Sequence, residues 1–436
     1  MLQRTKIEDL KKHIGKEVLV EGFIHEIRDQ SKVKFILLRD NSGIIQTVTL
    51  PDKKKIFENI AKINRESVLS IGGIVKSEKQ APSGIEIHVN DYKILSEADK
   101  NLPIQIVEKG EETALPTRLD WRWLDLRKPK NLFIFKIWTD MEAAMREYWL
   151  ANGFIQIYTP KFVAGATESG AELFSLDYFG KKASLAQSPQ FYKQMAMAAG
   201  FERIFEIGPV FRANKSHTIR HDTEFTSVDI EVSYIDSHED IMKIEEEWIV
   251  HILKKIKQKY GKQVKEVYGV DVVVPKLPFP RITMAEALTL LKKEYKHTCV
   301  GDLDPEGEKL LCEYTKKKYN SEFVFVHDWP INIRPFYHMR TDHGTTKSFD
   351  LLWKGMEITT GAQREHRYSI LKKQAKEKNI PMEGIKNYLE FFKYGCPPHG
   401  GYGLSPTRVL MLMLGIRVVF IYPKEILGGD LLIPGR

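Results

Sequence analysis

Residues 203–232 contain the feature that most constrains the fold: a strand, a polar loop and a second strand in direct succession. Residues 204–211 are apolar and rich in β-formers, and the Lys-Ser-His-Thr run at 215–218 is typical of a loop. Residues 225–232 then alternate between a face of mostly polar side chains and an apolar face, which predicts a half-buried strand. The stretch is therefore interpreted as two strands joined by a polar loop.

Three cationic side chains surround this loop. Arg212 lies where the first strand runs out, and Arg220 and His221 lie where the second begins. Two planar guanidinium groups beside an imidazole suit a polyphosphate, because each guanidinium can bind phosphate through two hydrogen bonds. The alternative is a surface hairpin in which the arginines pair with Glu206 and Glu224, and the pattern alone favours this alternative.

Length and composition set the broad class of the protein. A chain of 436 residues is long enough for two or three domains, and 42% hydrophobic with 28% charged residues is typical of a globular protein. No apolar run is long enough to span a membrane, and the N-terminus lacks a signal-peptide core. A net charge of +8 is compatible with a nucleic-acid partner. Three widely spaced cysteines without a zinc pattern indicate reduced thiols and a cytoplasmic location.

Residues 1–100 are expected to form a small β-barrel. A helical stretch at 53–66 follows the third of five β-rich runs, which is typical of an OB-fold, and the runs lie at 18–27, 34–39, 44–50, 68–76 and 85–94. Phe35 and Gln46 lie on adjacent predicted strands, where an aromatic ring and an amide can stack on and read a nucleic-acid base. The alternative is that Phe35 belongs to the core and Gln46 is merely exposed to solvent.

The remaining pattern predicts a linker and a larger domain. Prolines punctuate residues 101–130, which are read as the linker. Residues 131–152 show helical spacing and end at Asn-Gly, before a predicted strand at 154–160. Further helices are expected at 239–260, 282–295 and 306–319, with a strand at 323–326.

Two stretches carry residues suited to an amino-acid substrate. Glu168 lies in a small-residue loop that could close over a substrate and hold its ammonium group. Gln190 and Lys193 share one face of a predicted helix, where Lys193 could bind a carboxylate. A plain surface loop and a solvated lysine are the alternatives.

Two further stretches carry residues suited to a nucleotide. Asp350 and Glu357 lie on adjacent predicted strands and offer oxygen ligands to Mg²⁺. Pairing of these acids with lysines 347 and 354 is the alternative. Residues 395–414 read as a glycine-rich strand that runs into an apolar helix carrying Arg408, with Ser405 as its N-cap. Here the alternative is a core helix with a glycine-rich lead-in.

These stretches together resemble the class II aminoacyl-tRNA synthetases. Residues 211–226 resemble motif 2 of that family, residues 131–160 resemble motif 1, and residues 395–414 resemble motif 3. The Gln-Ser-Pro-Gln string at 187–190 and the Gly-Ala-Gln-Arg string at 361–364 narrow the resemblance to aspartyl-tRNA synthetases of the archaeal and eukaryotic type.

The resemblance implies a fold and a domain organisation. The expected protein is a multidomain α/β chain. Residues 1–100 would form an anticodon-binding OB-fold barrel, residues 101–130 a linker, and residues 131–436 a class II catalytic domain with an antiparallel sheet flanked by helices. It also implies ATP and Mg²⁺ as cofactors, L-aspartate and tRNA as substrates, and a homodimer.

The resemblance also assigns roles to individual residues. Aspartate would be bound by Glu168, Gln190, Lys193, Arg212, Thr360 and Arg364. ATP would be bound by Arg212, Asn214, Arg220, His221, Asp222, Phe225, Glu357, Ser405 and Arg408, with Arg212 and Arg408 acting in catalysis. Mg²⁺ would be held by Asp350, Glu357 and Thr360. The anticodon would contact Phe35, Gln46, His25, Glu78 and Pro82.

Some residues depart from the family pattern or leave alternatives open. Asn214 stands where the family usually has an acid, and residues 405–407 replace the usual lead into the motif 3 arginine. His25 and Pro82 look like the pair found in enzymes that accept tRNA for both aspartate and asparagine. An asparaginyl-tRNA synthetase is the nearest rival, although Arg364 favours a carboxylate over an amide. An RNA-binding paralogue that does not charge tRNA is the other alternative.

Overall fold

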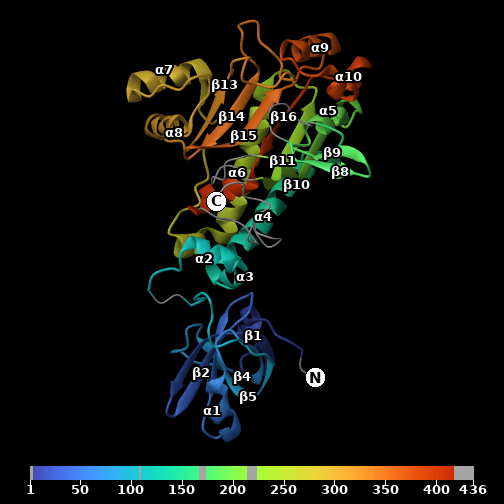
Figure 1. The fold of residues 1–436 in the computed structure, drawn as a ribbon. Helices are drawn as coiled ribbons and strands as arrows, with labels where there is room; N and C mark the ends of the chain where they lie inside the picture. Colours follow the sequence, from blue (N-terminus) through green and yellow to red (C-terminus); the bar gives the residue numbers. More distant parts are fainter. Residues whose placement is uncertain (1–2, 108–109, 166–172, 214–222, 417–436) are drawn as a thin grey trace. The chain divides into compact units, whose positions relative to one another are not determined.

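The computed structural model describes residues 3–107, 110–165, 173–213 and 223–416, which form two compact units (Figure 1). The first unit contains the described residues up to Lys136, and the second contains those from Ile137 onward. The division falls inside one helix, α4 (Pro129–Ala151).

The first unit is built on a closed five-stranded barrel. The strands follow the order β1-β2-β3-β5-β4, with β3 and β5 parallel and the other pairs antiparallel. Alternate residues such as Val18, Val20, Ile36 and Leu38 point inward and form its core. The strands are β1 (Glu17–Gln30), β2 (Val33–Arg39), β3 (Ile44–Thr49), β4 (Val68–Ser77) and β5 (Ile85–Ser96). The predicted OB-fold is therefore confirmed.

Short helices complete this unit. η1 (Ile7–His13) precedes the barrel, and α1 (Lys54–Asn59) with η2 (Ile60–Lys62) follows the third strand, so the helical stretch expected at 53–66 is shorter than predicted. After the barrel come α2 (Leu115–Asp120) and α3 (Arg122–Asp125), which the sequence pattern did not reveal. α3 ends at a buried acid, Asp125, to which Arg122 and Lys128 are paired at 2.5 and 3.0 Å.

The second unit is organised around an eight-stranded sheet. Its order is β12-β13-β14-β15-β16-β11-β10-β6, and only the outermost pair at each edge is parallel. The strands are β12 (Arg281–Thr283), β13 (Phe323–His327), β14 (Ser348–Trp353), β15 (Met356–Gln363), β16 (His399–Leu404), β11 (Glu224–Ser233), β10 (Arg203–Phe211) and β6 (Ile155–Gln156). The predicted antiparallel sheet is confirmed, but the strand expected at 154–160 has only two residues.

Helices α4 and α6 (His238–Tyr268) pack against one face of this sheet. Trp149 of α4 stacks on Phe205 of β10 and on Trp248 of α6, with ring centroids 4.7 and 4.9 Å apart. Trp248 in turn lies 5.7 Å from Tyr402 of β16. Because side chains alternate along a strand, the intervening residues of these strands point to the opposite face of the sheet.

Other helices cover the edges and the polar face of the sheet. α7 (Met284–Tyr295) and α8 (Pro305–Tyr319) lie beside the β12–β13 end of the sheet, while α5 (Gln190–Ala198) lies beside β10 and β11 (Figure 1). A smaller sheet joins β7 (Phe162–Val163), β9 (Lys181–Leu185) and β8 (Ser175–Tyr178). α9 (Tyr368–Glu377), η3 (Met382–Ile385) and α10 (Lys386–Lys393) precede β16, and α11 (Pro406–Leu414) follows it.

Candidate active site

The alternating strand β11 builds the floor of the site. Val228, Ile230 and Val232 are buried apolar residues, as the period of two predicts. The intervening residues Ser227, Asp229 and Glu231 are buried as well. The polar face of β11 is therefore buried, and Ser227 and Asp229 line a cavity.

The cavity has a volume of about 320 Å³ and collects residues from distant parts of the chain. Its lining includes Gln190 and Lys193 from α5, Arg212 directly after β10, and Phe225, Ser227 and Asp229 from β11. It also includes Arg334, Tyr337 and His338 from residues 333–338, Glu357 and Thr360 from β15, Arg364 directly after β15, and Ser405 and Arg408 around the start of α11. Pairing of strands in the antiparallel sheet thus brings together the separate stretches that the sequence singled out.

Two buried cations lie at one end of the cavity. The Lys193 ammonium is 2.8 Å from a carboxylate oxygen of Asp229 and 3.5 Å from one of Glu231. Arg364 donates from Nε to Glu231 at 3.0 Å, and from Nη2 to the carbonyl oxygen of Gly401 at 2.9 Å. All four charged side chains are almost fully buried, so each ion pair compensates a desolvated charge.

His338 lies beside these two cations without adding a third positive charge. Its Nε2 lies 3.1 Å from Nη1 of Arg364. Complete burial, together with the nearby Arg364 and Arg334 guanidinium groups, holds the pKa of His338 well below its usual range. The imidazole is therefore neutral at pH 7 and can accept a hydrogen bond from the guanidinium.

Two further acids, Asp350 and Glu357, lie on the neighbouring strands β14 and β15. Asp350 of β14 pairs with Thr360 of β15 in the strand register, and its Oδ2 accepts from Arg334 at 2.6 Å. Burial raises the pKa of Asp350 to about 7, and nearby Glu357 adds to this rise although Arg334 opposes it. The Thr360 hydroxyl donates to Glu357 at 3.2 Å.

The Mg²⁺ ligands expected from the sequence fit a hard cation in this structure. Asp350 Oδ1 is buried and has no hydrogen-bonding partner among the described residues. A second carboxylate and a hydroxyl lie close by, and oxygen atoms are the ligands that Mg²⁺ prefers. Divalent charge would also relieve the repulsion between the two acids.

Two arginines face the cavity from different elements. Arg408 donates to the backbone carbonyl of Glu357 at 2.7 Å, and Ser405 caps its helix by accepting from the Arg408 amide at 3.4 Å. The Arg212 guanidinium lies 5.5 Å from the ring centroid of Phe225. A planar ligand against this aromatic ring would have cations beside it.

The remaining residues expected at the site are Glu168, Asn214, Arg220, His221 and Asp222, which lie outside the described residues. Conversely, sequence reasoning missed Asp229, Glu231, Arg334 and His338. The alternation of residues 225–232 was the one signal for the two acids, since it placed them on the face that carries Phe225. Arg334 and His338 lie in a segment without regular periodicity, so only the fold reveals them.

The barrel brings together some of its expected anticodon residues. Phe35 pairs with Val48 and Leu37 with Gln46, so Phe35 and Gln46 share one face of the β2–β3 pair, opposite to core residue Ile36. The alternative in which Phe35 belongs to the barrel core is therefore wrong. The amide of Gln46 donates to Glu86 at 2.9 Å. Glu78 and Pro82 lie at the connection between β4 and β5.

His25 lies in a different environment. It is 2.7 Å from Arg39, at the other end of β2, and Arg39 is paired with the buried Glu66. Partial burial and the Arg39 charge lower the pKa of His25. Arg127 also reaches Glu66, at 3.2 Å, and thereby joins the segment after the barrel to this polar cluster.

Comparison with known proteins identifies both units. The family model for class II tRNA synthetases (D, K and N) matches residues 114–426, and that for OB-fold nucleic acid binding domains matches residues 18–95. The aspartate–tRNA(Asp/Asn) ligase of Methanopyrus kandleri is 44% identical over 94% of this chain and 95% of its own. The aspartate–tRNA(Asp) ligase of Pyrococcus abyssi is 43% identical over the same shares.

Solved structures agree with this result. Asparaginyl-tRNA synthetase from Pyrococcus horikoshii, complexed with asparaginyl-adenylate, has a TM-score of 0.90 at 30% identity, with all of both chains covered. Aspartyl-tRNA synthetase from Entamoeba histolytica has a TM-score of 0.85 at 31% identity, covering 97% of this chain and 91% of its own. Among the described residues, none of the helices has the length and hydropathy required to cross a bilayer.

Proposed function

Because this chain belongs to the class II tRNA synthetases of the aspartate, lysine and asparagine group, we propose that it is an aspartate–tRNA ligase that charges tRNA-Asp and also tRNA-Asn. It activates L-aspartate with ATP to form aspartyl-adenylate and pyrophosphate. It then transfers the aspartyl group to the terminal ribose of the tRNA.

The observation that carries the choice of amino acid is the pair of buried cations, Lys193 and Arg364. A substrate carboxylate beside them exchanges its hydration for charge-assisted hydrogen bonds. An amide in the same position offers no negative charge and brings an NH₂ group toward a guanidinium, which has no acceptor. Asp229 and Glu231 supply the counter-charges that keep both cations folded into the cavity, and Asp229 can also bind the substrate ammonium group.

ATP binds in the same cavity, where Arg212, Phe225 and Arg408 are among the lining residues. Arg212 and Arg408 neutralise charge at the α-phosphate as the aspartate carboxylate attacks, and Phe225 stacks on adenine. Enzymes of this family use ATP and Mg²⁺. Here Asp350, Glu357 and Thr360 would hold Mg²⁺, which would supply positive charge to the phosphates when bound. No protein nucleophile is required, because positioning and electrostatic stabilisation carry this kind of transfer.

The use of two tRNAs rests on the barrel and on the relatives. Relatives from Methanopyrus kandleri and Aeropyrum pernix are named aspartate–tRNA(Asp/Asn) ligases, whereas that from Pyrococcus abyssi is named for tRNA(Asp) alone. Phe35 stacks on an anticodon base, and Gln46 reads a base edge. His25 and Pro82 form the pair that relaxes the choice of tRNA.

The enzyme acts as a homodimer. Motif 1 of the family corresponds to residues 131–160, and this region and the small sheet carry several exposed apolar side chains, among them Leu150, Tyr158, Phe162 and Phe179. A cluster of large exposed apolar residues is typical of an interaction surface. Sedimentation of the purified protein tests this assignment, and a monomer at micromolar concentration would contradict it.

ATP–pyrophosphate exchange with aspartate and asparagine in parallel tests the amino-acid assignment. Exchange is expected with aspartate and not with asparagine. Arg364→Leu should abolish the aspartate reaction, whereas Arg367→Leu, which removes a nearby arginine that is paired with Glu365, is the matched control. Charging of separate tRNA-Asp and tRNA-Asn transcripts then tests the dual tRNA use.

Asparagine remains the second candidate because the asparaginyl-tRNA synthetase named above has a TM-score of 0.90 to this chain. Exchange with asparagine alone would support that candidate and overturn the argument from Arg364. Exchange with neither amino acid, together with retained ATP binding, would instead support a paralogue that does not charge tRNA.

A further inference from the structure

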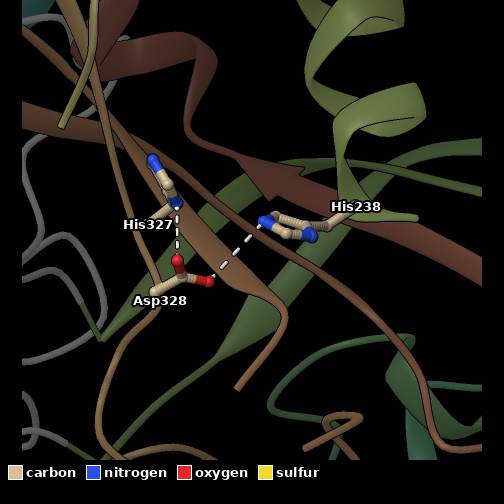
Figure 2. Close-up of side chains that lie close together, drawn as sticks. All are labelled: His238, His327 and Asp328. Carbon is tan, nitrogen blue, oxygen red and sulfur yellow. Dashed lines mark ion pairs between the residues drawn. The ribbon is translucent and has the colours of Figure 1, made fainter. Parts of the chain in front are cut away.

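Two histidines and an aspartate converge at the edge of the large sheet, away from the cavity. His238 is the first residue of α6, His327 is the last residue of β13, and Asp328 follows it. Figure 2 shows the Asp328 carboxylate between the two imidazoles, with one oxygen facing each ring. Oδ2 lies 3.2 Å from Nδ1 of His327, and Oδ1 lies 4.0 Å from Nε2 of His238.

His238 is the unusual member of this cluster. The residue is only 8% exposed, and neither of its ring nitrogens has a hydrogen-bonding partner among the described residues. Buried polar atoms are nearly always hydrogen-bonded, so the ring nitrogens of His238 can take a further partner such as water or a metal ion.

We propose that His238, His327 and Asp328 form a binding site for a divalent transition-metal ion of the zinc type. Two imidazole nitrogens and one carboxylate oxygen are a common three-residue ligand set for zinc, and water completes the tetrahedron. One ligand atom from each residue lies within 4.8 Å of the others. Ligand atoms around tetrahedral zinc are about 3.4 Å apart, so small side-chain rotations suffice.

The neighbouring charged groups have other partners or the wrong charge. Glu239 of α6 pairs with Arg281 at 2.8 Å, and Glu286 of α7 accepts from Thr283 in a capping box. Lys347 contributes a positive charge near His238 and cannot bind a cation. The three proposed ligands are therefore the groups left to hold the ion, which would join the start of α6 to the end of β13.

A second cluster provides an internal comparison. His297, Cys299 and Asp304 lie between α7 and α8, and each is partly exposed. The His297 ring is already within 2.9 Å of Asp304, whose carboxylate also caps α8. This cluster therefore has its hydrogen bonds satisfied without a metal, in contrast to His238.

Cobalt titration of the full-length protein tests the proposal. Chelator-treated protein, kept in millimolar Mg²⁺ to occupy oxygen-ligand sites, is titrated with Co²⁺ near neutral pH while the visible absorption of tetrahedral cobalt is followed. We expect one equivalent to bind and Zn²⁺ to displace it. His238→Gln and His327→Gln should each weaken binding by more than about 100-fold, since loss of a ligand exceeds the effect of losing a supporting residue.

Matched variants identify the site. Asp328→Asn removes one charge at a position with a left-handed φ of 59°, a conformation that Asn tolerates, so it should fold normally and still weaken Co²⁺ binding. His251→Gln, on the same helix, and His297→Gln, in the second cluster, should bind as the unaltered protein does. Absence of a cobalt complex, binding unchanged by Asp328→Asn and both His variants, or loss only in His297→Gln would overturn the proposal.

Discussion

Glu231 shows at the scale of one residue how the site is held together. Its carboxylate is fully buried and lies between Arg364 and Lys193. We expect Glu231→Gln to lower the free energy of unfolding by about 3–5 kcal/mol, because buried cations lose a counter-charge. Urea denaturation measures this loss. Glu390→Gln, which breaks an exposed pair with Lys393, should cost less than about 1 kcal/mol.

Glu245 gives a pH-dependent prediction. Burial raises its pKa from an ordinary 4.5 to about 8. Between these values the unfolded chain has released the proton while the folded protein keeps it, so rising pH favours the unfolded state. Glu245→Gln removes this effect. Its stability relative to the unaltered protein should therefore increase from about pH 5 to pH 8, by a few kcal/mol on the order of 1.4 per pH unit, and then level off.

Thermal or urea unfolding across this pH range measures the difference between the two proteins. Glu247→Gln is the control, because its carboxylate on the same helix is exposed and only accepts one hydrogen bond at the surface, from the Tyr148 hydroxyl. A constant difference between Glu245→Gln and the unaltered protein across the range would show that Glu245 is ionised when folded.

At the scale of elements, the start of α11 positions Arg408. Ser405 accepts from the Arg408 amide, and Pro406 occupies the first turn. Ser405→Ala should lower the free energy of unfolding by about 1 kcal/mol, and it should weaken ATP binding because the first turn carries Arg408. Ser405→Asp, which keeps an acceptor, should retain the stability. If Ser405→Ala binds ATP as tightly as the unaltered protein does, the helix cap does not affect the nucleotide site.

Close packing behind β15 gives a second prediction for an element. A Cβ added at Gly361 would lie 2.2 Å from Cζ of Phe349, so the ring or the strand must shift. Gly361→Ala should cost about 1–3 kcal/mol, and it should impair aspartate activation because β15 also carries Thr360 and leads into Arg364. Gly384→Ala, where the added methyl meets no atom within 4 Å, is the control for both measurements.

Elements with a clear local signal were predictable, and the contacts between them were not. The five barrel strands follow from β-rich runs, and the helix at α11 follows from Ser405 and Pro406. The strand expected at 154–160 is shorter than predicted because, at the edge of the sheet, it pairs with β10 over only two residues, Ile155 and Gln156. Pairing with a distant strand is a property of the fold that local sequence does not encode.

At the scale of the whole molecule, the site combines residues that are far apart in the sequence. Lys193, Asp229, His338 and Arg364 meet only after β11, β15 and β16 have paired. Lys193 and Arg364 could be predicted because Lys193 follows the Gln-Ser-Pro-Gln string, Arg364 ends the Gly-Ala-Gln-Arg string, and both strings resemble the family. Asp229 and His338 required the register of the sheet, because an acid in an alternating strand or a histidine in an irregular segment is not informative alone.

The net charge of the chain and the surface of the barrel both bear on how tightly the protein binds tRNA. The chain carries a net charge of +8, so tRNA binding should weaken with rising salt. Phe35→Ala should weaken tRNA binding by about 5- to 150-fold, corresponding to the 1–3 kcal/mol of one base stack. Gln46→Ala should act in the same direction.

ATP–pyrophosphate exchange should remain unchanged in both variants, because Phe35 and Gln46 belong to the barrel unit and the exchange reaction requires the cavity of the other unit. Gln30→Ala, at the exposed end of β1, controls for nonspecific effects on the barrel surface. Filter binding and aminoacylation at several salt concentrations separate the two contributions. A Phe35→Ala protein that binds tRNA normally would show that electrostatic contacts alone hold the tRNA on this barrel.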